Sequence, residues 1–101
     1  MPRAYSKRDT RIRVRAGDRF SIVLDANPTT GYEWHAAVDG DAVALQDASL
    51  TPGTGALGAA GAQRFEFEAK HAGRVHVSLT LSRSWEPSPI ETVQSVIEVA
   101  E

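Results

Sequence analysis

The chain has 101 residues, of which 42% are hydrophobic and 24% charged, and its formal net charge is −2. This length supports one domain with a single core, and the composition is ordinary for a folded domain. Cysteine is absent, which excludes disulfides, thiolate catalysis and cysteine-ligated metals within this chain, and no apolar run approaches the roughly 20 residues that span a bilayer.

The N-terminal segment is polar and has no alternating pattern. We expect residues 1–10 to be flexible and residues 11–101 to form a single domain. Residues 1–20 contain no apolar segment of the kind found in signal peptides. We therefore expect a cytoplasmic location, or a periplasmic or secreted one if a leader has been removed.

Basic residues are concentrated near the N-terminus. Seven of the eleven Lys and Arg residues lie within the first nineteen positions, where two Asp residues oppose them. Arg11, Arg13 and Arg15 alternate with Ile12 and Val14, which is typical of a strand with one solvent face. Charges on such a strand protect a sheet edge from aggregation, and no aromatic–basic motif accompanies them. We therefore predict no nucleic-acid partner and no membrane partner.

Alternating apolar and polar residues predict a series of short strands separated by turns. The predicted strands cover residues 12–14, 20–24, 32–38, 43–45, 64–68, 75–82 and 92–100. Val96 breaks the alternation of the last strand, which indicates a bulge or burial on both faces. About seven to eight such strands without a helical period predict an all-β, antiparallel immunoglobulin-like β-sandwich.

The stretch Asn27-Pro28-Thr29-Thr30-Gly31-Tyr32 connects two predicted strands and has an unusual composition. Pro28 fixes its own φ, and Gly31 permits a positive φ where the chain turns back. Tyr32 and Trp34 share one face of the next strand, where we expect them to anchor the loop in the core. The sequence thus predicts a short loop whose shape is set before it meets a partner.

Two further stretches interrupt the strand pattern. Residues 48–62 contain four glycines and a proline, which give no helix or strand prediction and suit either a binding loop or a flexible linker. Arg83-Ser84-Trp85 follows a long predicted strand, and two prolines after it end regular pairing. In an immunoglobulin-like sandwich these two stretches and residues 27–32 can gather at one end.

No constellation of catalytic or metal-binding residues is evident in the sequence. His35 and His76 fall on the solvent face of predicted strands, His71 falls in a turn, and their spacing does not suit a metal. The sequence contains neither a nucleophile elbow nor a phosphate-binding loop. We therefore predict that the protein is not an enzyme and uses no metal or other cofactor.

Together the three stretches resemble the chagasin family, immunoglobulin-like protein inhibitors of papain-type cysteine proteases. Residues 27–32 match the family's first inhibitory loop, Asn-Pro-Thr-Thr-Gly-Tyr, at every position. Leu57-Gly58-Ala59-Ala60-Gly61 is similar to the second loop, whose core is Gly-x-x-Gly, and Arg83-Ser84-Trp85 is similar to the third, normally Arg-Pro-Trp. We expect Ser84 in place of proline to weaken the pre-organisation of the third loop without loss of function, since a well-placed proline contributes roughly 0.4–1 kcal/mol.

The resemblance implies a reversible, tight-binding inhibitor that plugs the active-site cleft of a papain-like cysteine protease with three adjacent loops. The implied protease-binding residues are Asn27, Pro28, Thr29, Thr30, Gly31, Tyr32, Leu57, Gly58, Ala59, Ala60, Gly61, Arg83, Ser84 and Trp85. By the same resemblance the first loop covers the catalytic cysteine and histidine, and the second flanks the non-primed side. In the third loop, Trp85 packs on an aromatic surface of the protease and Arg83 offers charge-assisted hydrogen bonds.

Two alternatives to an inhibitor remain open from the residues. The chain could be an immunoglobulin-like adhesion or ligand-binding module without protease inhibition, or a domain of a larger secreted protein. Fold alone does not decide between these functions. Under the inhibitor hypothesis we expect the free chain to be a monomer.

Overall fold

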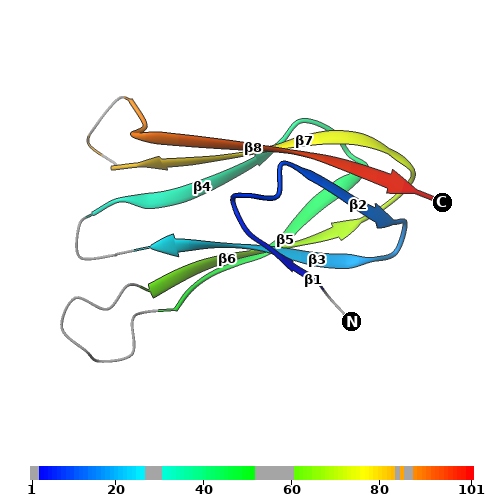
Figure 1. Ribbon diagram of the computed structural model, residues 1–101, viewed down its shortest axis with the longest axis horizontal. Helices are drawn as coiled ribbons and strands as arrows, with labels where there is room; N and C mark the ends of the chain where they lie inside the picture. Colours follow the sequence, from blue (N-terminus) through cyan, green and yellow to red (C-terminus); the bar gives the residue numbers. More distant parts are fainter. Residues whose placement is uncertain (1–2, 27–30, 52–60, 84, 86–87) are drawn as a thin grey trace.

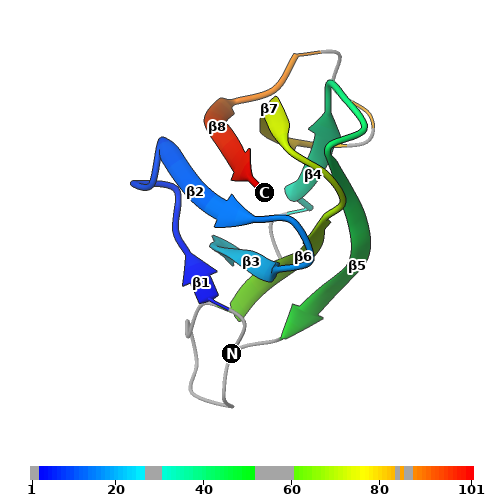
Figure 2. The same ribbon diagram turned by 90° about the vertical axis from the view of Figure 1, so that its right-hand side faces the viewer.

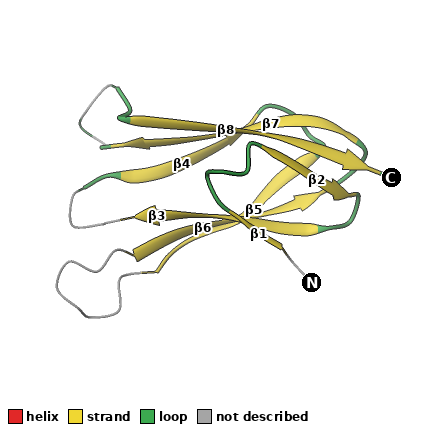
Figure 3. Ribbon diagram, viewed as in Figure 1, coloured by secondary structure: helices red, strands yellow, loops and turns green. Residues whose placement is uncertain are grey.

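The computed structural model describes residues 3–26, 31–51, 61–83, 85 and 88–101. Eight strands follow in chain order: β1 (Arg3–Tyr5), β2 (Arg11–Arg15), β3 (Arg19–Ala26), β4 (Glu33–Val38), β5 (Val43–Thr51), β6 (Gly61–Ala69), β7 (Gly73–Ser82) and β8 (Glu91–Ala100). Sheet A has the order β1-β3-β6-β5, and sheet B has the order β2-β8-β7-β4. The two sheets pack face to face without a helix in the described residues, which confirms the predicted all-β sandwich (Figures 1 and 3). Accordingly, the described part of the chain holds no helix that is long and apolar enough to cross a membrane.

The sheets are mixed, not purely antiparallel as predicted. Strand β1 pairs in parallel with β3, and β2 pairs in parallel with β8. Both are edge strands on the same side of the sandwich, and the chain crosses from one sheet to the other between them (Figure 2). No alternating pattern predicts β1, because it has only three residues; Tyr5 holds it by packing edge-on against Phe20, with 6.1 Å between the ring centroids.

The predicted inward-facing residues form the core between the sheets. Phe20 of β3 stacks on Phe67 of β6 with 5.2 Å between the ring centroids, and both side chains are fully buried. The remaining buried apolar side chains are Ile12, Val14, Ile22, Leu24, Ala26, Trp34, Ala42, Val43, Phe65, Ala69, Val75, Val77, Leu79, Ile97 and Val99. As predicted, Arg11, Arg13 and Arg15 lie on the solvent face of an edge strand, β2.

The predicted bulge at Val96 is wrong. The register of β8 runs through this residue without a shift against both β7 and β2, and Val96 is half-buried on the outer side. The inward position next to it belongs to Ser95, which is fully buried and donates a hydrogen bond to the Asp9 carbonyl oxygen at 2.8 Å. Because a serine occupies a core position, the apolar alternation is broken while the pleat is not.

Strands β5 and β6 extend into the glycine-containing stretch that gave no strand prediction. Ala48 to Thr51 belong to β5, and Gly61 and Ala62 belong to β6, so only residues 52–60 between them lie outside the described residues. Antiparallel pairing, with Thr51 opposite Ala62, overrides the weak strand propensity of small residues. The irregularity of β5 lies elsewhere, in a bulge between Leu45 and Asp47.

Trp34 at the start of β4 ties sheet B to two strands of sheet A. Its indole Nε1 donates to the Asp25 carbonyl oxygen of β3 at 3.0 Å. The buried Gln63 of β6 accepts from the Trp34 backbone N–H at 2.7 Å through Oε1 and donates from Nε2 to the Trp34 carbonyl oxygen at 3.2 Å. The side-chain amide of Gln63 therefore completes the hydrogen bonds of an edge-strand residue whose backbone is turned toward the core.

Replacement of Gln63 by methionine tests this bridge. Methionine fills a similar volume but leaves the Trp34 N–H and carbonyl unpaired in the interior, so we expect a loss of about 2 kcal/mol in the free energy of unfolding. Urea denaturation measures it, with Gln94→Met on the exposed face of β8 as the control, which should change stability by less than about 0.5 kcal/mol. Equal effects of the two substitutions would contradict the bridge.

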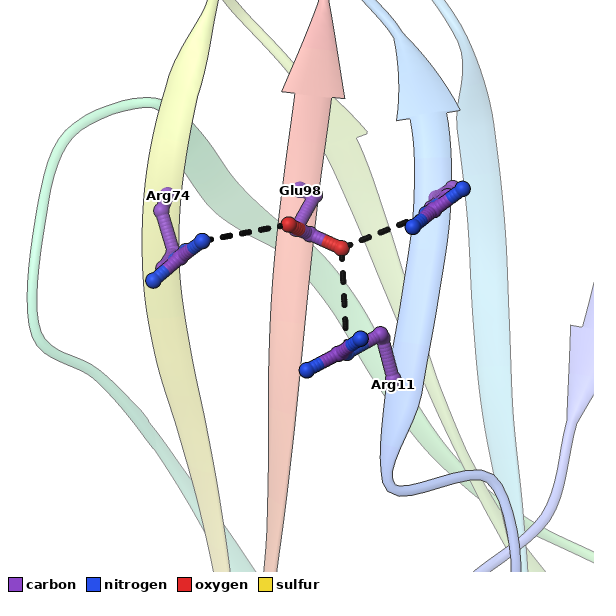
Figure 4. A network of polar contacts seen from close by, with 4 residues as sticks. Arg11, Arg74 and Glu98 are labelled. Atoms are coloured by element: carbon purple, nitrogen blue, oxygen red, sulfur yellow. Dashed lines mark hydrogen bonds and ion pairs between the residues drawn. The ribbon is translucent and has the colours of Figure 1, made fainter.

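Ion pairs connect the three neighbouring strands β2, β8 and β7 across the outer face of sheet B. Figure 4 shows Glu98 between Arg11 and Arg74. Glu98 Oε1 lies 3.8 Å from Arg11 Nε and 3.3 Å from Arg13 Nε, and Glu98 Oε2 lies 3.3 Å from Arg74 Nη2. The hydrogen bond from Arg13 and the other two guanidinium groups lower the pKa of Glu98. Because all three arginines are largely exposed, this cluster contributes little to stability and mainly offsets charge on the edge strand.

Two histidine–aspartate pairs lie at the end of the sandwich where β4 ends, away from Gly31 and Tyr32. His76 Nδ1 lies 3.0 Å from Asp39 Oδ2, and the His76 backbone N–H donates to Asp39 Oδ1 at 2.7 Å, which lowers the pKa of Asp39. His71 places Nδ1 3.0 Å from the Ala72 carbonyl oxygen and Nε2 3.1 Å from Asp41 Oδ1. Oxygen acceptors at both ring nitrogens favour the imidazolium, so the pKa of His71 is raised.

This arrangement predicts a pH-dependent contribution of His71 to stability. A folded-state pKa above the ordinary value of 6.5 gives stabilisation that is fully present below pH 6.5 and lost as the pH rises through the folded-state pKa. We expect His71→Gln to lower the urea midpoint more at pH about 5.5 than at pH about 8.5. Asp41→Asn should remove only part of the pH dependence of this effect, because the Ala72 carbonyl oxygen still favours the charged His71. A destabilisation by His71→Gln that grows as the pH rises would contradict the raised pKa of His71.

Candidate functional site

Strands β3, β5 and β7 end, and strands β4, β6 and β8 begin, at the same end of the sandwich (Figure 1). The strand registers fix this arrangement. Ala26, which precedes the first predicted loop, pairs with Gly61, the last residue of the second. Glu33, after the first loop, pairs with Ser82, which precedes the third. The first loop therefore begins beside the second and ends beside the third.

Gly31 and Trp85 bring the first and third loops into direct contact. Gly31 has a φ of +80°, a conformation that residues with side chains rarely adopt. A Cβ atom on Gly31 would lie only 2.7 Å from Cη2 of the Trp85 indole. Glycine is thus required at position 31 for two reasons, the backbone conformation and the close approach of the indole.

Arg83 connects the same two loops through aromatic rings. Its Cζ atom lies 4.1 Å from the centroid of the Tyr32 ring and 5.6 Å from that of the Trp85 ring. Cation–π contacts at exposed sites contribute about 0.5–1 kcal/mol each. Tyr32 is half-buried and lies outside the core cluster, so it anchors the loop through Arg83 and not, as predicted, in the core; Trp34 alone of the two aromatic residues is buried there.

The structure describes five of the predicted protease-binding residues. Gly31, Tyr32, Arg83 and Trp85 lie together, and the side chain of Trp85 is 68% exposed. Gly61 is buried as the first residue of β6, so it forms the base of the second loop. The other predicted residues lie outside the described residues: Asn27, Pro28, Thr29, Thr30, Leu57, Gly58, Ala59, Ala60 and Ser84.

Two residues near this end of the sandwich were not predicted from the sequence. Gln63 supports the start of β4 through its hydrogen bond with Trp34. The sequence does mark it, because it is a polar residue at an alternating position that Phe65 and Phe67 fill with inward-facing side chains. Leu50 is 47% exposed at the end of β5 and lines a hollow of about 230 Å³ with Ala26, Gly31, Tyr32 and Glu33. No sequence signal marked Leu50, because it fell within a stretch without a strand prediction.

The described residues at the loop end carry features of a binding surface. Among them, no group of three or more His, Asp or Glu side chains could hold a metal ion. The loop end offers instead an exposed indole, a guanidinium held against two rings, and the exposed apolar side chains of Leu50 and Ile90. A β-sandwich with such an end defines a protein that acts by binding a partner.

Comparison with known proteins identifies the family. The sequence profile of the chagasin family peptidase inhibitor I42 matches residues 13–99. Chagasin of Trypanosoma cruzi is 31% identical over 78 residues, an alignment that covers 71% of each chain. The chain belongs to the chagasin family of peptidase inhibitors, which are not enzymes.

Solved structures with low sequence identity share the fold. The cysteine protease inhibitor EhICP2 of Entamoeba histolytica superposes with a TM-score of 0.82 at 19% identity, covering 96% of each chain. Amebosin gives a TM-score of 0.79 at 21% identity over 98% of each chain. PbICP-C, solved in complex with falcipain-2, gives 0.70 at 14% identity, over 99% of this chain and 90% of its own.

The contact between Gly31 and Trp85 predicts a specific effect of Gly31→Ala. Gly17 offers a matched control, because its φ is +95° and a Cβ there would meet nothing within 4 Å. Both alanine variants should lose about 1–2 kcal/mol of stability from the left-handed backbone. Only Gly31→Ala should displace the indole and so increase acrylamide quenching of Trp85 fluorescence, over a constant background from the buried Trp34. Equal quenching of both variants would contradict the contact.

Proposed function

We propose that this protein is a reversible, tight-binding inhibitor of papain-like cysteine proteases that plugs the active-site cleft with three adjacent loops. The observation that carries the proposal is the contact of Gly31, Tyr32, Arg83 and Trp85 at one end of the sandwich. These residues belong to the first and third motifs of the family, and the family consists of peptidase inhibitors. One structural neighbour is a cysteine protease inhibitor and another was solved with falcipain-2, which supports this class of partner.

Residues of each loop take distinct roles in the proposed complex. Thr29, Thr30 and Gly31 cover the catalytic cysteine and histidine of the protease, and residues 57–61 flank the non-primed side. Trp85 packs on an aromatic surface on the other side of the cleft. Arg83 has a role within the inhibitor as well, because its contact with Tyr32 holds the third loop against the first.

Pre-organisation is the physical basis of tight binding in this proposal. An interface that orders flexible side chains on association loses about 0.5–1.5 kcal/mol for each of them. Trp85 is already in contact with Gly31, and Arg83 with Tyr32, before a protease is present. The loops therefore lose less entropy on binding, while the exposed indole supplies apolar area of the kind that dominates interfaces.

Inhibition of papain by Trp85→Ala tests the proposal. Loss of an exposed aromatic contact of about 2 kcal/mol should raise the inhibition constant at least about 30-fold. The control is Leu45→Ala, which removes a 42% exposed side chain that lies away from the loop end of the sandwich. This variant should leave the inhibition constant unchanged. Both variants should keep the wild-type unfolding transition. A wild-type protein that inhibits no papain-type protease at micromolar concentration would refute the function.

A further inference from the structure

Strand β5 carries an apolar strip on the inner face of sheet A that sheet B leaves uncovered. Leu45, Ala48 and Leu50 pair opposite Phe67, Phe65 and Gln63, whose side chains are buried in the core. Residues directly opposite in an antiparallel pair point to the same side of the sheet. All three β5 residues are nevertheless exposed, with Leu45 at 42% and Leu50 at 47%.

The two ends of this strip have different surroundings. Leu45 lies next to the bulge, toward the end of the sandwich away from the loops. Leu50 lies next to the last residue of β5 and lines the hollow of about 230 Å³ with Gly31, Tyr32 and Glu33. The hollow at Leu50 is therefore continuous with the two residues that carry the contact between the first and third loops.

The size of a stable interface calls for contacts beyond the three motifs. The proposed binding residues number fourteen, whereas a standard interface uses about 20–30 residues on each side. A partner seated over Gly31 and Tyr32 also covers the hollow beside them. Leu50 is the exposed large apolar side chain that lines this hollow, and burying it adds binding energy with little loss of side-chain entropy.

Resting on the proposed function, we propose that Leu50 and its hollow form a fourth contact with the protease. The hollow receives an apolar side chain from the rim of the cleft, between the positions of the first and second loops. The residues that line it include the apolar Leu50 and Ala26 and one carboxylate, Glu33. The fourth contact lies on a strand, so its position is set by the sheet and not by a loop.

Leu50→Ser and Leu45→Ser form a matched pair for the test, because both remove an exposed leucine from the same face of the same strand. We expect Leu50→Ser to raise the inhibition constant for papain about tenfold or more, and Leu45→Ser to leave it unchanged. Urea denaturation should give similar stabilities for the two variants. Equal inhibition constants for the two variants, with the wild type active, would overturn the fourth contact and leave the proposed function intact.

A labelling experiment tests the contact independently of affinity. The chain contains no cysteine, so Leu50→Cys and Leu45→Cys each provide a single site for an environment-sensitive maleimide dye. Addition of papain should shift the emission of the dye at position 50 to the blue and leave that at position 45 unchanged. A silent dye at position 50, on a labelled protein that still inhibits, would overturn the inference. Absence of inhibition by the unlabelled wild type would instead refute the proposed function, and the fourth contact with it.

Discussion

The bridge between Trp34 and Gln63 determines where the first loop leaves the sandwich. Trp34 lies three residues after Gly31, and its backbone bonds to the buried amide of Gln63 while its indole bonds to Asp25. These hydrogen bonds hold the beginning of β4 against β6 and the end of β3. Since the first loop connects β3 to β4, the bond between the Trp34 indole and Asp25 ties the strand before the loop to the strand after it.

The strand registers then determine how the remaining described residues at the loop end lie relative to one another. Glu33 opposite Ser82 brings Tyr32 beside Arg83, and the guanidinium contacts the ring. The absence of a side chain at Gly31 then lets the indole of Trp85 lie against the first loop. The contact between Gly31 and Trp85 thus joins the first loop to the third.

The sequence predicted the features that depend on alternation and missed those that depend on long-range pairing. Inward Phe20, Phe65 and Phe67 followed from period two, because a half-buried sheet requires it. The broken alternation at Val96 predicted a bulge or burial on both faces and not a buried Ser95, because alternation records polarity and cannot show that the Asp9 carbonyl accepts a hydrogen bond from Ser95. The parallel pairing of β1 with β3 and of β2 with β8 likewise depends on neighbours distant in sequence. A strand of three to five residues has no sequence pattern that shows which strand it pairs with or in which direction.

For the candidate site, composition identified the motif residues, and only pairing could show their mutual contacts. Gly31 was expected to turn the chain. Its second role, which is to leave room for the indole of Trp85, could be seen only from the contact between the two residues. Leu50 could not be recognised because its exposure results from its position on β5, an edge strand whose inner face is exposed from Leu45 to Leu50. Because 47% of Leu50 stays exposed to water, only part of its apolar surface stabilises the isolated fold. Its position beside Gly31 and Tyr32 is therefore better explained by burial against a partner than by folding of the chain itself.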